Sequence, residues 1–212
     1  MRKAIVSGAN GFVGSAVVKE LISQGYEVYA LVRENHYDQV PINEMVRIVP
    51  FSLENIEALG EVIPINEYEA FYHFAWNGSA GVDRADTALQ LKNAQWTVEC
   101  LQMAKRLGCK RFVPAGSIME HETIAAVYTQ GNRPGAGYIY GSGKVAAHMM
   151  CMSMAVKEGI NLVWPKITNA YGPSERSPRL VNSTIRKCIA GEDPQFTAGT
   201  QNYDFVYIDD VP

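Results

Sequence analysis

Gly8-Ala9-Asn10-Gly11-Phe12-Val13-Gly14 is the stretch that decides the fold. It follows a short apolar run at residues 4–7, which predicts a buried strand, and it opens an apolar pattern typical of one face of a helix that ends at Gly25. Glycines in such a loop permit a tight turn and a close approach of the backbone to a pyrophosphate, and the helix N-terminus adds N–H groups and partial positive charge. The sequence therefore predicts a dinucleotide-binding loop, with an ordinary glycine-rich turn as the alternative.

Beyond this loop, segments typical of strands and helices alternate along the chain. Further strands are predicted at residues 27–32, 47–51, 70–75, 111–115 and 162–167, and helices at 53–63, 84–107 and 138–158. This alternation favours an α/β fold, a doubly wound Rossmann arrangement whose parallel sheet carries helices on both faces. Ligands of such sheets bind at the carboxyl ends of the strands.

The pattern changes from Gly172 onward, where Pro173, Pro178 and Pro194 interrupt the alternation. We therefore predict a dinucleotide-binding domain at residues 1–171 and an incomplete, smaller substrate-binding lobe at residues 172–212. The abrupt stop after residue 212 leads us to expect a truncated chain.

Composition excludes several classes of protein. A net charge of −3 provides no general basic field for nucleic acid. The sequence contains no apolar stretch of roughly 18 residues, so we expect no membrane span, and its N-terminus lacks the features of a signal peptide. The four cysteines form no CxxC pair and have no histidine cluster beside them, which predicts idle thiols in a reducing, cytoplasmic setting and no metal site.

The end of the second predicted strand bears on the choice of dinucleotide. NAD-binding proteins usually place an acidic residue there for the ribose 2′-hydroxyl, whereas this chain has Val32 followed by Arg33. A guanidinium matches phosphate oxygens, so Arg33 favours NADP over NAD as the cofactor. The alternative is that Arg33 lies on the surface and that Glu34 takes the ribose.

Tyr140 and Lys144 are four residues apart and share one face of the predicted helix at 138–158. A tyrosine with a pKa of about 10 is a weak base at neutral pH, but a lysine ammonium one turn away stabilises its phenolate. The pair can therefore move a proton on or off a substrate oxygen during hydride transfer. Tyr138, six residues from Lys144, is interpreted as a packing or cleft-lining residue.

Ser117 ends the predicted fifth strand, at the edge of the sheet where ligands bind. A hydroxyl there can donate a hydrogen bond to a reacting oxygen, although it can equally cap a turn or helix. Trp76 follows the fourth strand and brings a large ring to the same edge, where it either stacks on a substrate ring or packs in the core.

The glycine spacing with Asn10 inside it resembles the extended short-chain dehydrogenases/reductases, and the string GANGFVG resembles the NAD-dependent epimerase/dehydratase family of nucleotide-sugar enzymes. Further segments of the chain match that family's patterns: YHFA at 72–75, Asn93, YxxxK at 140–144, NAYGP at 169–173 and DFVYIDD at 204–210. The resemblance therefore covers essentially the whole chain.

The resemblance implies a set of site residues. The implied catalytic residues are Ser117, Tyr140 and Lys144. The implied substrate-binding residues are Ser117 and Asn169, and Trp76, whose large ring stands where the family commonly has small residues, is predicted beside them. The implied cofactor-binding residues are Gly8, Asn10, Gly11, Phe12, Val13, Gly14, Leu53, Phe74, Ala75, Asn93, Tyr140 and Lys144. Two residues that depart from the family pattern are predicted to join them: Arg33, for the reason given above, and Ser52, which stands where the family commonly has an Asp near the adenine. It also implies a homodimer formed by the two long helices near residues 84–107 and 138–158.

Departures from the family pattern narrow the expected reaction. The 4,6-dehydratases carry Asp and Glu directly after the catalytic hydroxyl residue, but this chain has Ile118 and Met119, which cannot transfer protons, and Glu120 comes one place late. We therefore expect hydride transfer at C4 of a nucleotide-linked hexose, by a 4-epimerase or a 4-ketoreductase. Two alternatives stay open: a non-enzymatic dinucleotide sensor, and a small-molecule carbonyl reductase, because Tyr203 replaces an Arg that meets the substrate pyrophosphate in relatives.

Overall fold

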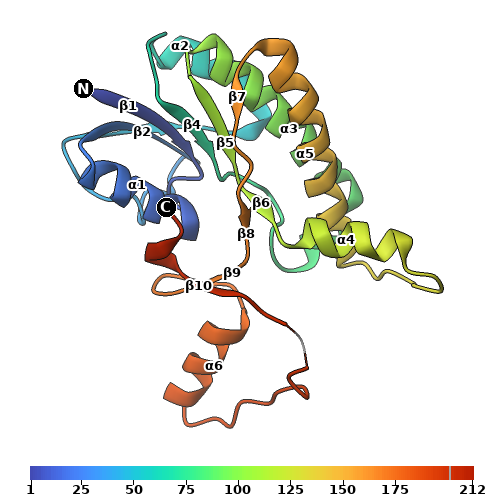
Figure 1. Cartoon of the computed structure of the whole chain (residues 1–212). Helices are drawn as coiled ribbons and strands as arrows, with labels where there is room; N and C mark the ends of the chain where they lie inside the picture. The colour runs from blue at the N-terminus through green and yellow to red at the C-terminus, as the bar shows by residue number, and fades with distance from the viewer. Residues whose placement is uncertain (201) are drawn as a thin grey trace.

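The computed structural model describes residues 1–200 and 202–212, and its centre is a six-stranded sheet of order β3-β2-β1-β4-β5-β7 (Figure 1). Every pair of neighbouring strands in this sheet is parallel. The predicted Rossmann sheet is thereby confirmed. Its strands are β1 (Arg2–Ser7), β2 (Tyr26–Val32), β3 (Val46–Pro50), β4 (Ala70–His73), β5 (Arg111–Pro114) and β7 (Asn161–Leu162).

The two central strands send alternate side chains to opposite faces of the sheet. Ala4 and Val6 of β1 pack on one side with Val17, Val18 and other residues of α1 (Phe12–Ser23). Ile5, between them in the sequence, packs on the other side in the larger core cluster. Apolar residues at every strand position therefore build two cores, as expected for a sheet covered by helices on both faces.

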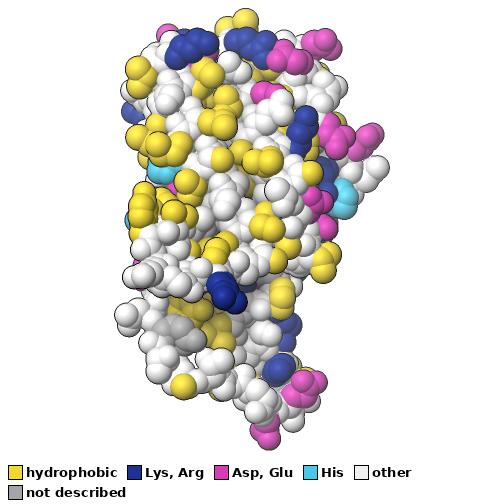
Figure 2. Space-filling view, turned by 90° about the vertical axis from the view of Figure 1, so that its right-hand side faces the viewer, with side chains coloured by type: hydrophobic (Ala, Val, Ile, Leu, Met, Phe, Trp, Pro, Cys, Tyr) yellow, Lys and Arg dark blue, Asp and Glu magenta, His cyan; other side chains and the backbone are white. Residues whose placement is uncertain are grey.

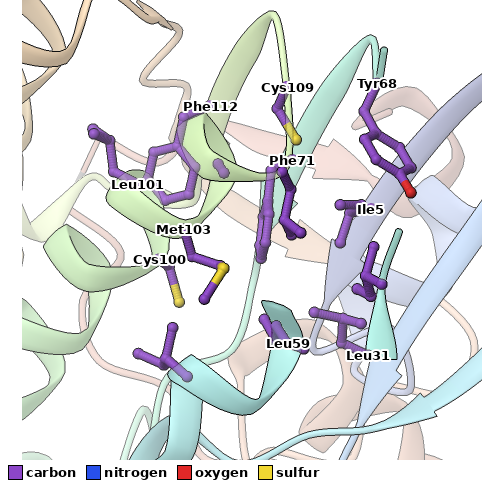
Figure 3. Close-up of a cluster of buried hydrophobic side chains, with 14 of the residues drawn as sticks. Ile5, Leu31, Leu59, Tyr68, Phe71, Cys100, Leu101, Met103, Cys109 and Phe112 are labelled. Atoms are coloured by element: carbon purple, nitrogen blue, oxygen red, sulfur yellow. The ribbon is translucent and has the colours of Figure 1, made fainter. Parts of the chain in front are cut away.

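The larger core lies beneath two long helices, α3 (Thr87–Arg106) and α5 (Tyr138–Glu158), which lie on the opposite side of the sheet from α1 (Figure 1). Figure 3 shows Phe71 and Phe112 from neighbouring strands among Leu101 and Met103 of α3. The bounds predicted for the second long helix agree with those of α5, which ends at Gly159 in the left-handed conformation.

Two predicted elements differ in the structure. The helix expected at 53–63 is a 3₁₀ segment, η1 (Leu53–Ala58), followed by the single turn α2 (Leu59–Val62), because Asn55 leaves helical geometry with φ −138° and ψ 60°. The strand expected at 162–167 is interrupted, because Pro165 has no N–H to donate and its carbonyl accepts from Gly116 N at 2.8 Å. The chain then resumes as β8 (Lys166–Ile167), which pairs with β6 (Gly116–Ser117) in a separate small sheet.

The remaining elements surround the carboxyl ends of the strands. Two helices were not predicted, α4 (Met119–Tyr128) and α6 (Leu180–Ile189). A short 3₁₀ turn, η2 (Val82–Ala85), precedes α3. Strand β9 (Asn169–Tyr171) pairs in parallel with β10 (Phe205–Tyr207), and η3 (Ile208–Asp210) follows. Among the described helices, none has the length and apolar character needed to cross a membrane.

Candidate active site

A cleft of about 910 Å³ lies at the carboxyl ends of the strands. It runs from the glycine loop past the ends of β2 and β4 to the start of α5 and the segment around β9. With the exception of Asn93, every predicted site residue lines it: Gly8, Asn10, Gly11, Phe12, Val13, Gly14, Arg33, Ser52, Leu53, Phe74, Ala75, Trp76, Ser117, Tyr140, Lys144 and Asn169.

The glycine loop has the geometry of a cradle for backbone-to-phosphate contacts. Gly8 has φ +66°, and a Cβ there would lie 2.8 Å from the backbone nitrogen of Ala75. A Cβ on Gly14 would collide with the Gly8 carbonyl oxygen. The first helical bond of α1 runs from Ser15 N to Gly11 O at 2.9 Å, so the amides of the first helical turn, which precede it, have no partners within the helix. They are the groups that bind phosphate at such helix ends.

A buried histidine holds the two strand ends that flank this loop. Thr97 Oγ1 donates to Asn93 O at 2.8 Å, so its contact of 3.4 Å with His73 Nε2 requires a proton on that nitrogen. His73 Nδ1 is then free to accept from Ser7 Oγ at 2.8 Å, and Ser7 Oγ in turn accepts from Ala75 N at 3.4 Å. Complete burial lowers the pKa of His73 to about 3, so the ring is neutral and ties β1 to β4.

Asn10 connects the glycine loop to the segment after β2. Its Nδ2 donates to His36 O at 2.7 Å. Arg33 is exposed and lines the cleft beside this contact. Ser52 begins η1, where its hydroxyl accepts from Glu54 N at 3.2 Å, and Leu53 beside it is buried. Asn10, Arg33, Ser52 and Leu53 thus line one part of the cleft, next to the end of β2.

Asn93 differs from the other predicted cofactor residues because its side chain is buried against a loop. Its Oδ1 accepts from Asn77 N at 2.9 Å, and its Nδ2 donates to Asn77 O at 2.8 Å. Asn77 itself lines the cleft. Asn93 therefore holds in place the loop that follows β4, one residue behind the cleft wall.

Lys144 is buried at the base of the site. Its Nζ donates to Ala115 O at 2.9 Å and lies 3.6 Å from the centroid of the Trp76 ring. The same ammonium is 5.8 Å from the centroid of the Tyr140 ring. Burial lowers the pKa of Lys144 to about 7, against the opposing effect of the negative charge of Glu120.

Burial has the largest effect on the pKa of the Tyr140 phenol and raises it. A hydrogen bond with Ser117 lowers that pKa, as do the positive charges of Arg84 and Arg179. Ser117 thus contacts the phenol, and its hydroxyl also accepts from Met119 N at 3.2 Å, as the capping alternative expected. The structure therefore brings Ser117, Tyr140 and Lys144 together at one end of the cleft.

Several polar residues of this site were missed by sequence reasoning. Glu120 is 1% exposed; its Oε1 accepts from Ser117 N at 2.7 Å and from Trp164 Nε1 at 3.1 Å, and its Oε2 contacts His148 Nδ1 at 2.8 Å. His148 stacks on Trp164 with a centroid distance of 4.4 Å. No local pattern signals this cluster, since its members come from distant parts of the chain.

Gln90 is a second missed residue, and a signal for it exists. It stands three residues before Asn93 on α3, so both share a helix face, and Gln90 is 1% exposed. Its Oε1 accepts from Trp76 Nε1 at 2.8 Å. Trp76 is therefore anchored by its indole N–H while its ring faces the cleft between Lys144 and Tyr140.

The other reactive side chains form no further centre in the described part of the chain. No group of three or more His, Cys, Asp or Glu residues there is arranged to hold a metal ion. Three of the four cysteines, Cys100, Cys109 and Cys151, are buried free thiols, and Cys188 is an exposed one.

A parallel sheet of this order, with a glycine loop at its central strand and Ser, Tyr and Lys side chains beside it, defines a Rossmann-fold protein of the short-chain dehydrogenase/reductase class. The family follows from comparison with family models: residues 4–212 match the NAD dependent epimerase/dehydratase family. The chain belongs to this family, as its motifs led us to expect.

Relatives of known activity are distant and longer. UDP-glucuronic acid decarboxylase 1 of Xenopus tropicalis is 26% identical over 221 residues, which cover 99% of this chain and 52% of that protein. The dTDP-6-deoxy-L-talose 4-dehydrogenase (NAD(+)) of Aggregatibacter actinomycetemcomitans is 26% identical over 98% of this chain and 76% of its own length. The chain thus spans about half the length of the UDP-glucuronic acid decarboxylases that it matches.

Solved structures agree in fold. UDP-glucose 4-epimerase from Thermotoga maritima, described with UDP-glucose, has a TM-score of 0.79 and 22% identity, covering 99% of this chain and 70% of its own. UDP-glucuronic acid 4-epimerase from Bacillus cereus, described in complex with NAD, has a TM-score of 0.75 and 20% identity, covering 98% and 70%. At these identities the likeness establishes the architecture.

Proposed function

We propose that this chain carries the cofactor-binding and catalytic part of an NAD(P)-dependent nucleotide-sugar oxidoreductase that transfers hydride at C4 of the hexose, as a 4-epimerase or a 4-ketoreductase. One observation carries the proposal: Ser117, Tyr140 and Lys144 meet in the same cleft as the glycine loop. The names of the relatives, which include sugar-nucleotide 4-epimerases and a 4-dehydrogenase, support the class of substrate.

The residues of the cleft fit a dinucleotide. Glycines at positions 8 and 14 allow the loop to pack backbone against backbone, since a Cβ at either would collide with the chain itself, and the first turn of α1 brings Phe12, Val13 and Gly14 to the cleft wall. When bound, NAD(P) supplies the acceptor or donor of hydride. The backbone amides of the first turn would bind its phosphates, and Leu53 and Phe51 would provide an apolar wall for its adenine ring.

The proton chemistry belongs to three side chains. Tyr140 removes a proton from the substrate hydroxyl or returns one to the ketone, and Ser117 hydrogen-bonds the same oxygen. The Lys144 ammonium lies one helical turn away and favours the phenolate form of Tyr140. Because Ala115 O accepts from Lys144 Nζ, the ammonium is held at the base of the cleft before any substrate arrives.

Ile118 and Met119 bear on whether the site could also eliminate water from the sugar. Both line the cleft, and neither side chain can transfer a proton. The nearby carboxylate of Glu120 is occupied by Ser117 N, Trp164 and His148 and is buried away from the cleft. This arrangement argues against 4,6-dehydration and supports an epimerase or a reductase.

The decisive experiment titrates the purified protein with NADH and NADPH and then assays UDP-, dTDP- and GDP-sugars, including UDP-glucuronic acid. Turnover without net redox supports an epimerase, net NAD(P)H consumption with a 4-keto sugar supports a ketoreductase, and carbon dioxide release from UDP-glucuronic acid would reveal a decarboxylase instead. Turnover of simple carbonyl compounds alone would favour a small-molecule carbonyl reductase.

Tyr140→Phe tests the enzyme proposal against a dinucleotide sensor. We expect turnover to fall roughly 100- to 10,000-fold, because the proton-transferring group is removed. Tyr138→Phe is the matched control, since Tyr138 lies on the same helix and does not line the cleft. If Tyr140→Phe leaves every activity unchanged, the sensor is the better explanation.

The choice between NAD and NADP rests on Arg33. Its exposed guanidinium lines the cleft beyond β2, where it can contact a 2′-phosphate, although two of the relatives named above carry NAD in their descriptions. We propose NADP as the preferred cofactor. Arg33→Ala should then weaken NADPH binding and leave NADH binding nearly unchanged, whereas tighter NADH binding by the unaltered protein would reject the preference.

We also propose a homodimer through the outer faces of α3 and α5. Figure 2 shows hydrophobic side chains gathered on this side of the molecule. Met149, Met152 and Val156, spaced three and four residues apart, and Leu91 of α3 are exposed. Light scattering should report a dimer that Met152→Glu dissociates, while Val127→Glu, an exposed site on α4, leaves it intact. A monomeric unaltered protein would reject this interface.

A further inference from the structure

A second cation lies over the ring of Tyr140. The guanidinium carbon of Arg84, in η2, is 4.2 Å from the centroid of that ring. Trp76 meets the same ring edge-on at 5.9 Å, and Lys144 Nζ is 5.8 Å from its centroid. The phenol is therefore held between an aromatic ring and two basic side chains, only one of which is part of the YxxxK pair.

The loop that carries Arg84 is anchored to α3. Gln90 Nε2 donates to Gly78 O and to Asp83 O, each at 3.0 Å, while Gln90 Oε1 accepts from Trp76. One buried amide thus positions both neighbours of Tyr140. The guanidinium group of Arg84 is also held in place, because its Nη1 donates to Ser79 O at 3.1 Å.

We propose that Arg84 is a positioning residue for Tyr140, which holds the ring from its face and favours the phenolate form of its hydroxyl. A guanidinium within about 6 Å of a ring centroid is attracted to the negative face of the ring. A nearby positive charge also favours an ionised phenol. The inference rests on the proposed role of Tyr140 in proton transfer.

Arg84 keeps its positive charge at a pH where Lys144 begins to lose its own. The pKa of Lys144 is lowered to about 7, so above neutral pH this ammonium increasingly loses its proton. A guanidinium stays charged throughout that range. Arg84 therefore keeps a positive charge over the Tyr140 ring in mildly alkaline solution.

The other groups that face Tyr140 come from three elements. Ser117 of β6 forms a hydrogen bond with the phenol, and Arg179 at the start of α6 adds positive charge, and both lower the pKa of the phenol. Glu120 of α4 raises it, as does burial of the ring. Lys144 stands on the same helix as Tyr140.

The test titrates the phenol of Tyr140 itself. Phenolate absorbance is followed against pH in the unaltered protein and in Arg84→Met, each with the corresponding Tyr140→Phe background subtracted. We expect the pKa of Tyr140 to rise by about one unit in Arg84→Met. In Arg84→Lys the positive charge is kept, so the pKa of Tyr140 should rise less. Arg106→Met is the matched control, because Arg106 pairs with Glu57 on the surface of α3.

Activity gives the second readout. Arg84→Met should shift the pH profile of kcat/KM toward alkaline pH, with cofactor affinity unchanged. An unshifted phenol in Arg84→Met, or an equal shift in Arg106→Met, overturns the inference. If Arg84→Met fails to fold, Arg84→Gln and Arg84→Lys provide the same titration. Undiminished turnover by Tyr140→Phe would instead reject the proposed function, while the titration would still report on Arg84.

Discussion

The glycine-loop region and the segment after Gly172 are built in different ways. In the first, all positions of β2 from Glu27 to Val32 are buried, and the cradle is formed by backbone packed on backbone. In the second, α6 has no buried residue. It is held by hydrogen bonds: Asn182 donates to the carbonyl oxygens of Gly172 and Glu175, and Arg186 to those of Glu175 and Ser177.

This difference indicates where each region is sensitive to change. Where backbone approaches backbone, an added methyl group has no space, because close-packed interiors relax little. Where the long side chains of α6 donate to loop carbonyls near the surface, water can replace a lost contact, so each loss costs about 1 kcal/mol. Substitutions in the two regions should therefore differ both in size and in what they affect.

The largest effect is expected from Gly14→Ala. Its Cβ would collide with the Gly8 carbonyl, so the loop and α1 must move apart, at a cost on the order of 3 kcal/mol, with loss of dinucleotide binding. Thermal unfolding and NAD(P)H titration measure both effects. Gly60→Ala is the control, since a Cβ there would meet only Met103 Cε at 4.0 Å. Unchanged cofactor affinity in Gly14→Ala would show that the close backbone packing of the glycine loop is not required for dinucleotide binding.

Glu120→Val should produce the next largest effect. Valine leaves the buried donors Ser117 N and Trp164 Nε1 without an acceptor, and we expect about 2 kcal/mol less stability in urea unfolding. Glu120→Gln keeps the accepting oxygen and should lose much less. Equal losses in both variants would show that the charge, and not the hydrogen bonds, matters here.

His73 predicts a pH dependence of stability in the glycine-loop region. Its folded pKa, about 3, lies below the ordinary value of 6.5, so between these values the unfolded state binds more protons and stability falls as pH falls. From pH 6.5 to 5 this amounts to roughly 2 kcal/mol, before carboxylates such as Glu57 and Glu69, whose pKa values are lowered from 4.5, begin to contribute. His73→Gln should flatten the unfolding free energy in this window. An equally steep loss in His73→Gln would assign the dependence to other groups.

The two regions also differ in how far the sequence predicts them. The six strands of the parallel sheet, the bounds of α5 and the shared helix face of Tyr140 and Lys144 follow from local periodicity and spacing, whereas α4 and α6 do not. The burial of Glu120 does not, because its partners His148 and Trp164 come from other elements. The break at Pro165 and the polar contacts of Asn182 likewise depend on tertiary neighbours that no local pattern specifies.

The smallest effect is expected where the two regions touch. Arg176 Nη2 lies 3.2 Å from Asp38 Oδ2, and both side chains are largely exposed. An exposed ion pair of this kind gains little, because solvent and salt screen it, so Asp38→Asn should change the unfolding free energy by no more than roughly 0.5 kcal/mol. Hydrogen exchange gives a finer measurement, since Asp38 and Arg176 both line the cleft. Faster exchange in α6 with unchanged exchange in β1 would indicate that this pair restrains only the segment after Gly172, whereas faster exchange in β1 would couple that segment to the cofactor loop.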